Sequence, residues 1–171
     1  MNHIQTNEGL HIHAVLHNAK ASVQNARCVV MVPPKEFRYN AETAQDNEFQ
    51  HKVDLNDGLV RDKAMQEFVA MVSGLRQAGV QVIEFDYPVS EKETPDAVFP
   101  NNWFSTTAEG ELFVFPMACA NRQLEVRPQA LIEALERADK KVITQSSLVS
   151  FAKRSAFLES TGVMVMDHVN Q

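Results

Sequence analysis

The feature that most constrains the fold of this chain is an internal repeat with a shift of about 60 residues. Residues 75–83 align with 135–143, and the next segment, Pro95–Phe104, falls on Ser155–Met164. Each unit predicts a helix, a strand, a polar-tipped loop and another strand, which makes the fold class a repeated α/β module. Only a handful of positions match, so chance similarity between two βα units is the alternative.

Hydrophobic periodicity predicts where the helices and strands of these units lie. Apolar residues recur at three- and four-residue steps between Leu59 and Ala78, which is typical of an amphipathic helix. Gly79 supplies its stop, and Pro128 suits the first turn of a second helix that ends at Ala138. The apolar positions of the first helix are Val60, Ala64, Phe68, Met71, Val72 and Leu75. The expected strands are 28–33, 80–85, 98–106, 112–116, 141–144 and 162–169.

The third unit is incomplete in this sequence. It begins at Ser155, and the sequence stops at Gln171, before the helix of that unit. The closing strand carries four apolar residues in a row, from Val163 to Met166, and such a strand is usually buried on both faces. We therefore expect a truncated array of about two and a half modules.

Composition and charge exclude several classes of function. The chain has 171 residues, enough for one domain with a core, and is 44% hydrophobic and 22% charged, as ordinary globular proteins are. A net charge of −6 and a pI near 5.5 argue against a nucleic-acid partner and an anionic membrane surface. No apolar run approaches the roughly 18 residues of a membrane span, and residues 1–20 lack the core of a secretory signal. With Cys28 and Cys119 interpreted as reduced thiols, the sequence predicts a cytoplasmic protein.

The segment 94–104 (TPDAVFPNNWF) combines charged, amide and aromatic side chains within a few residues. Asp96 can pair with a cation, and the amides of Asn101 and Asn102 both donate and accept hydrogen bonds. Phe99 and Trp103 can supply flat apolar walls. A guanidinium group needs this combination of acceptors and walls. The alternative is an ordinary apolar strand flanked by turn residues.

Several segments resemble the guanidino-group-modifying superfamily, which includes arginine deiminase, dimethylarginine dimethylaminohydrolase and the amidinotransferases. The most specific is PDAVFPNNWFST at 95–106. The other segments are 32–33, 37–50, 116–117, 121–122 and 157–162. The closest likeness is to the citrulline-utilisation hydrolase branch, often labelled amidinotransferase, and the resemblance spans 27–169. It implies a five-bladed α/β propeller, the pentein fold, with one site at the central axis and only its N-terminal half in this chain.

The resemblance also implies roles for individual residues. In the superfamily a Cys thiolate attacks the guanidinium or ureido carbon, a His acts as general acid and base, and carboxylates hold the nitrogens. Asp96 resembles the substrate-binding Asp, and Asn101 and Asn102 occupy positions where relatives have carboxylates. Glu159 resembles an acidic residue near the catalytic His, which makes it the candidate catalytic residue. Arg122 falls in a segment that contacts a substrate carboxylate.

Departures from the family pattern limit what this chain is expected to do. Asn102 lacks the usual charge, which suits a neutral ureido group such as that of citrulline. Gln123 stands where a second Arg is usual, and this puts binding of the substrate carboxylate in question. Ser160 replaces an expected Gly, and a positive φ there would cost on the order of 1 kcal/mol. The catalytic His and Cys of the family have no counterpart, and Cys119 is interpreted as an unreactive thiol.

Three interpretations remain open. The first, which we favour, is a truncated hydrolase or amidinotransferase relative that is inactive alone. The second is one half of a split enzyme, whose open strand edges would drive association with the missing half or with itself. The third is a non-enzymatic binding module in which Asp96 and Asn102 sense a ligand. In each case the ligand is a small guanidino or ureido compound, with no metal or cofactor, and we expect 1–26 to be a poorly ordered leader and 27–171 to be the domain.

Overall fold

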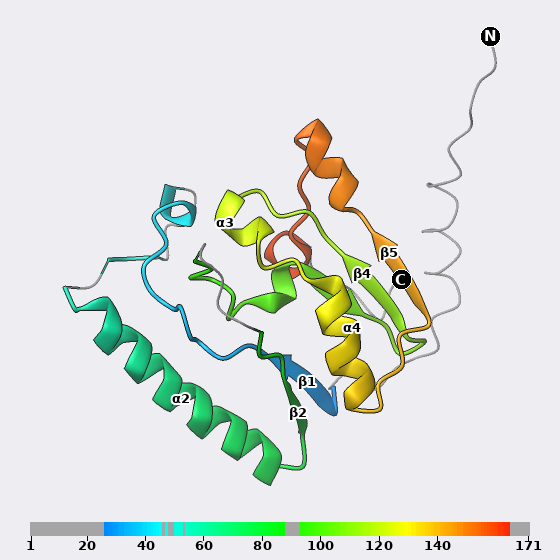
Figure 1. The fold of residues 1–171 in the computed structure, drawn as a ribbon, viewed down its shortest axis with the longest axis horizontal. Helices are drawn as coiled ribbons and strands as arrows, with labels where there is room; N and C mark the ends of the chain where they lie inside the picture. Colours follow the sequence, from blue (N-terminus) through cyan, green and yellow to red (C-terminus); the bar gives the residue numbers. More distant parts are fainter. Residues whose placement is uncertain (1–25, 46, 48–49, 53, 88–92, 165–171) are drawn as a thin grey trace. The chain divides into compact units, whose positions relative to one another are not determined.

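The structure is a computed structural model, and it describes residues 26–45, 47, 50–52, 54–87 and 93–164 (Figure 1). Predictions for the leader and for residues 165–169 of the last strand lie outside the described residues. All described residues except Ala26 belong to one compact unit, Arg27–Met164. The elements of this unit are β1 (Cys28–Met31), η1 (Thr43–Gln45), α2 (Asp57–Gln77), β2 (Gln81–Glu84), η2 (Pro100–Asn102), β3 (Phe104–Thr106), β4 (Glu111–Val114), α3 (Ala120–Gln123), α4 (Pro128–Arg137), β5 (Thr144–Ser147), η3 (Val149–Arg154) and η4 (Ser160–Gly162).

The first half of the unit is a parallel βαβ arrangement. β1 and β2 pair in parallel, with Val30 opposite Ile83, and α2 connects them. The helix begins where the Asn56 side chain accepts a hydrogen bond from the Gly58 N–H at 2.8 Å. The predicted helix and the first two predicted strands are confirmed, with ends shifted by one or two residues.

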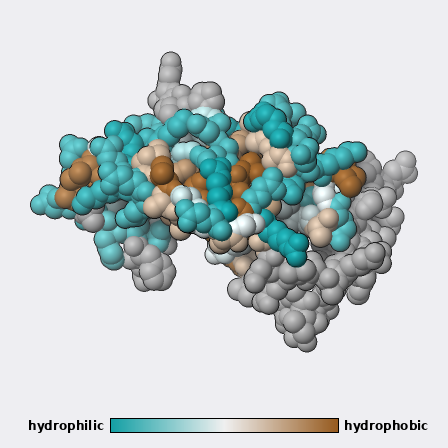
Figure 2. All heavy atoms as spheres, turned by 90° about the horizontal axis from the view of Figure 1, so that it is seen from below, coloured by the Kyte–Doolittle hydropathy of each residue, from teal (hydrophilic) through white to brown (hydrophobic). Residues whose placement is uncertain are grey.

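Most of α2 lies at the surface, and Figure 2 shows hydrophobic residues among hydrophilic ones on the face that it displays. Val72 is the buried residue of this helix. Met71, which the periodicity placed on the apolar face, is 59% exposed. Consecutive helical residues point about 100° apart, so Met71 and Val72 cannot both face the sheet. Among the described residues, no helix is long and apolar enough to cross a membrane.

The second half contains a three-stranded sheet in the order β3-β4-β5. β3 and β4 form an antiparallel hairpin, as predicted, and Gly110 takes a φ of 85° in its turn. β4 and β5 pair in parallel, and α4, which starts at Pro128, connects them. This half therefore repeats the βαβ arrangement of the first and adds a hairpin strand.

The strand predicted over 98–106 is mostly a turn, and this prediction was wrong. The Phe99 N–H donates to the carbonyl oxygen of Asp96 at 2.9 Å, and the 3-10 turn η2 follows. Pro95 and Pro100 have no N–H to donate to a strand ladder, so extended pairing is disfavoured through this segment. Only the last three residues of the prediction form a strand, which is β3.

Two further strand predictions need correction. The strand expected over 141–144 forms later, as β5, in register with β4, although Ile143 is 68% exposed. Hydrogen-bond pairing with β4 therefore decides its position rather than local hydrophobicity. Residues 162–164 do not form a buried strand, because Gly162 ends η4 and Val163 is 62% exposed.

The internal repeat is visible in the backbone. α2 and α4 are both followed by a left-handed residue, Gly79 with φ of 81° and Asp139 with φ of 58°. η2 and η4 also occupy equivalent positions, and the Asn101 side-chain amide donates to the hydroxyl of Thr161, 60 residues later, at 2.6 Å. The repeated α/β module is confirmed at these points. The described residues show a mixed α/β fold with two small sheets. A five-bladed propeller is not seen in them, so the prediction is confirmed only at the level of this coarser class.

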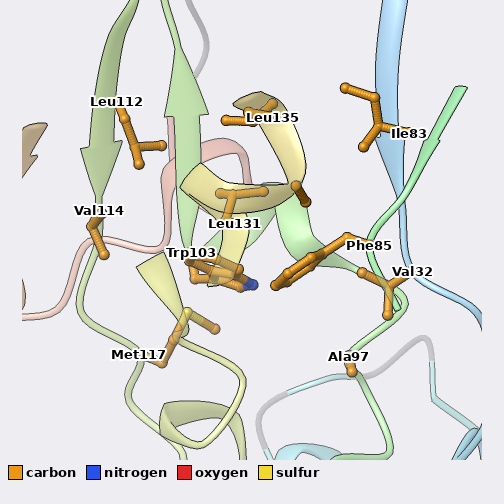
Figure 3. Packing of buried hydrophobic residues seen from close by; sticks show 11 residues of the cluster. Val32, Ile83, Phe85, Ala97, Trp103, Leu112, Val114, Met117, Leu131 and Leu135 are labelled. Atoms are coloured by element: carbon orange, nitrogen blue, oxygen red, sulfur yellow. The ribbon is translucent and has the colours of Figure 1, made fainter. Parts of the chain in front are cut away.

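The core lies between the two halves of the unit and ends directly beside the predicted site. Trp103 is 1% exposed, and its ring centroid is 6.3 Å from that of Phe85, while Leu131 of α4 packs into the same cluster (Figure 3). The suggestion that Trp103 is a substrate wall is therefore wrong, since this ring is part of the core. Because Trp103 follows η2 directly, the core anchors the segment 94–102.

Candidate functional site

Asp96 lies in a nearly closed polar environment. Its side chain is 6% exposed, and Oδ2 accepts hydrogen bonds from Asn40 Nδ2 at 2.7 Å and from the Thr43 hydroxyl at 3.0 Å. Asn40 is itself buried, and its Oδ1 accepts from Asn121 Nδ2 at 2.7 Å. The loop around η1 and the short helix α3 thus meet at the Asp96 carboxylate. Both hydrogen bonds described for this carboxylate use Oδ2.

Arg122 is buried and binds several parts of the site at once. Its Nε lies 3.2 Å from both carboxylate oxygens of Glu125, and Nη2 donates to Oε2 of the same residue at 3.0 Å. Nη2 also donates to the Phe99 carbonyl at 3.1 Å, and Nη1 donates to Asn102 Oδ1 at 3.0 Å. A longer contact of 3.5 Å reaches the Asp96 carbonyl. The guanidinium therefore connects α3 with the segment 96–102.

Glu125 is a site residue that the sequence analysis missed. It is 1% exposed, and burial raises its pKa from 4.5 to about 7, although Arg122 acts in the opposite direction. The charges of Asp96 and Glu159 raise this pKa further, so both carboxylates lie within electrostatic reach. The sequence offered one signal, the spacing of three residues from Arg122, which a helical turn brings together.

Glu159 and Asn102 meet around η4. Glu159 Oε1 accepts a hydrogen bond from the Ala118 N–H at 2.8 Å. A methyl group on Gly162 would come within 2.9 Å of Asn102 Nδ2 and 3.7 Å of the Glu159 Cβ, so these side chains surround the glycine. Ser160 has a φ of 42°, as the glycine of the family pattern suggested.

The remaining predicted residues lie at the edge of this group. Asn101 is exposed and pairs with Thr161 across the repeat. The side chain of Phe99 is 47% exposed, while its carbonyl oxygen binds Arg122. Asp96, Asn102, Arg122 and Glu159 are thus brought together by contacts or charge, and Asn101 and Phe99 flank them.

A cavity of about 530 Å³ adjoins the Asp96 partners. It is lined by Arg38, Tyr39, Asn40, Ala41, Glu42, Glu93, Pro95, Ala120, Asn121 and Leu124. Arg38 and Glu93 form an ion pair in its wall, which raises the pKa of Arg38 and lowers that of Glu93. Oδ1 of Asn121 is buried and has no hydrogen-bond partner among the described residues. The part of the chain that the structure describes contains no cluster of His, Cys, Asp and Glu that could hold a metal ion.

Comparison with protein families assigns the chain to a class. A family model described as N,N dimethylarginine dimethylhydrolase, eukaryotic, matches residues 33–171. The chain belongs to this family, which is part of the guanidino-group-modifying superfamily. No curated protein and no solved structure matches the chain. The match covers all the site residues described above, but it does not support the citrulline hydrolase branch in particular.

Proposed function

We propose that this chain forms part of a binding site for a small guanidino or ureido compound related to arginine, within a domain that spans 27–171. The observation that carries this proposal is a group of polar residues in a member of this family. The Arg122 guanidinium contacts the Asn102 side chain and the Asp96 carbonyl. Asp96 and Glu159 both lie within electrostatic reach of Glu125, the partner of Arg122. A buried carboxylate that already accepts two hydrogen bonds on one oxygen has its second oxygen for a ligand N–H.

The adjoining cavity suits the amino-acid end of such a ligand. Its wall contains Arg38 and Glu93, which could pair with the carboxylate and the amine of an amino acid. The side-chain oxygen Oδ1 of Asn121 is a buried acceptor, and leaving such an acceptor without a donor costs free energy. A ligand N–H in the cavity would satisfy it. Arg122 is proposed to orient the site from behind rather than bind the substrate carboxylate, because its N–H groups are directed at protein acceptors.

The choice between a guanidino and a ureido ligand depends on Asn102. The family is named for dimethylarginine. This ligand is cationic, so the carboxylate of Asp96 would favour its binding. Asn102 contributes no charge. Its Oδ1 accepts a hydrogen bond from Arg122, which leaves its amide N–H groups for a ligand acceptor. A ureido carbonyl is such an acceptor, so the similarity to the citrulline branch stays part of the proposal.

Binding can be tested by calorimetry and thermal unfolding with citrulline, arginine and N,N-dimethylarginine. Asp96→Asn keeps the shape of the side chain but removes its charge, and we expect it to weaken binding of the cationic ligands by about tenfold or more. Asp86→Asn is the matched control, because Asp86 is half exposed and pairs with Lys35 at the surface. Equal binding by the wild type and both variants would contradict the proposal.

The chain is proposed to have no catalytic activity when it is alone. Among the residues predicted to take part in catalysis, the described part of the chain holds Glu159. A carboxylate cannot replace the thiolate nucleophile, and Glu159 is not the general base that would activate a thiol. We expect no release of ammonia, ornithine or amine from the three ligands by the chain alone. Turnover that disappears in Cys119→Ser would instead identify that thiol as a nucleophile. Turnover that needs a second polypeptide would favour the split-enzyme alternative.

A further inference from the structure

The buried pair formed by Arg122 and Glu125 links three parts of the site through a single guanidinium group. Glu125 receives three of its hydrogen bonds. The segment 96–102 receives the others, through the Asn102 side chain, the Phe99 carbonyl and, at 3.5 Å, the Asp96 carbonyl. Both side chains are less than a tenth exposed, so solvent contributes little to holding them. The position of the segment therefore depends on how Glu125 orients Arg122.

We propose that the Arg122–Glu125 pair is a positioning pair, in which the ionised Glu125 side chain holds Arg122 so that the segment 96–102 presents Asp96 and Asn102 to the ligand. The consequence for ligand affinity rests on the proposed function. The consequence for the order of the segment does not, because it follows from hydrogen bonds within the protein.

The ionised form is the one that fits this geometry. A carboxylate is an acceptor only, and Glu125 uses both oxygens to accept from Nε and Nη2 of Arg122. Protonation places a hydrogen on one of these oxygens, which then faces an N–H donor. At least one charge-assisted hydrogen bond is lost, and the planar guanidinium is no longer fixed from that side.

Protonation of Glu125 falls in an accessible range of pH. Its pKa is raised to about 7, and the charged or titratable groups that act on it or near it are Arg122, Asp96, Glu159 and Tyr87. Burial keeps the pKa of Tyr87 above its usual value, so this phenol stays neutral. A cationic ligand at Asp96 would favour the ionised form of Glu125, and by linkage the ionised form would favour the ligand. A neutral ureido ligand would show less of this coupling.

Hydrogen exchange measured by mass spectrometry on the full chain tests the positioning role directly. The reporter is the peptide that contains 96–104, in which the Phe99 and Trp103 N–H groups are hydrogen-bonded within the segment. At about pH 8 we expect Glu125→Gln to speed exchange of this peptide by about tenfold, the equivalent of one lost hydrogen bond. Arg122→Lys keeps the charge without the planar fork and should have the same effect. Glu84→Gln, which removes one partner of the exposed Arg76 ion pair, is the control and should change nothing there.

The pH dependence of the exchange rate distinguishes the positioning role from a merely structural one, because a structural role would not depend on the ionisation of Glu125. After correction for intrinsic exchange, the wild-type peptide should exchange faster at about pH 6 than at about pH 8, and Glu125→Gln should show no such difference. The affinity of the wild type for N,N-dimethylarginine should also be lower at about pH 6 than at about pH 8. The affinity of Glu125→Gln should not change between these two pH values. If exchange is faster in Glu125→Gln but the wild type binds none of the ligands, the positioning pair is supported and the proposed function is overturned. Ligand binding with exchange identical in wild type and Glu125→Gln would overturn the positioning pair.

Discussion

The raised pKa of Glu125 predicts that the positioning pair reduces the stability of the fold at neutral pH. The side chain is buried, and the penalty of burial exceeds the attraction of Arg122, so the pKa lies near 7 rather than 4.5. The folded protein then binds this proton more tightly than the unfolded chain does. The contribution of Glu125 to the free energy of unfolding is therefore largest below pH 4.5 and is lost as the pH rises toward about 7.

The magnitude follows from the same pKa. Each pKa unit corresponds to about 1.4 kcal/mol, so a pKa raised from 4.5 to about 7 makes the ionised side chain about 3 kcal/mol less favourable in the folded state. Glu125→Gln replaces the carboxyl group by a neutral group of the same shape. We expect this variant to match the wild type at about pH 5 and to be about 3 kcal/mol more stable against global unfolding at about pH 8. The faster exchange expected for the segment 96–104 reports local opening, which is a separate transition.

The assay is urea unfolding followed by the fluorescence of Trp103, which is the single tryptophan of the chain and lies in the core. The difference between wild type and Glu125→Gln at each pH isolates this residue from the other titrating groups. Glu84→Gln should stay within about 1 kcal/mol of the wild type at both pH values, because its partner Arg76 is exposed. A Glu125→Gln variant that is less stable than the wild type at about pH 8 would refute the reasoning, since the attraction between the ionised pair would then exceed the cost of burial.

Three further predictions concern the repeat and the site. Gly79→Ala should lower the free energy of unfolding by about 1 kcal/mol in the same urea assay, because φ is 81° and the added methyl group meets no neighbour; an unchanged value would show that the left-handed residue is not required. Gly162→Ala should weaken ligand binding in calorimetry while changing stability by about 1 kcal/mol or less, since its methyl group would displace the Asn102 amide from Arg122. Asn102→Asp should shift preference from citrulline toward arginine and dimethylarginine, as measured by the ratio of their dissociation constants, and an unchanged ratio would remove Asn102 from the specificity argument.

The parts of this fold that could be predicted are those with a local cause. The helix between Asn56 and Gly79 has a cap, an apolar period and a stop within its own sequence, and it forms as predicted. The repeat could be found because equivalent turns need equivalent backbone, as the positive φ at Gly79 and at Asp139 shows. The turn that replaces the strand expected over 98–106 could not be predicted, because apolar residues placed near prolines are compatible with both a strand and a buried turn.

The candidate site divides in the same way. The sequence by itself determined the superfamily, because the residue types of the segment 94–104 and their order are specific to it. It also indicated the group of polar residues near Asp96, which is the combination that we propose to bind a guanidino or ureido group. Only the tertiary structure decided what each side chain contacts. It directs Arg122 inward toward the carbonyl of Phe99 and the amide of Asn102, and it buries Glu125 beside it. The physical reason is that burial and hydrogen-bond partners come from elements distant in the sequence, and these set both the orientation of an arginine and the pKa of a carboxylate.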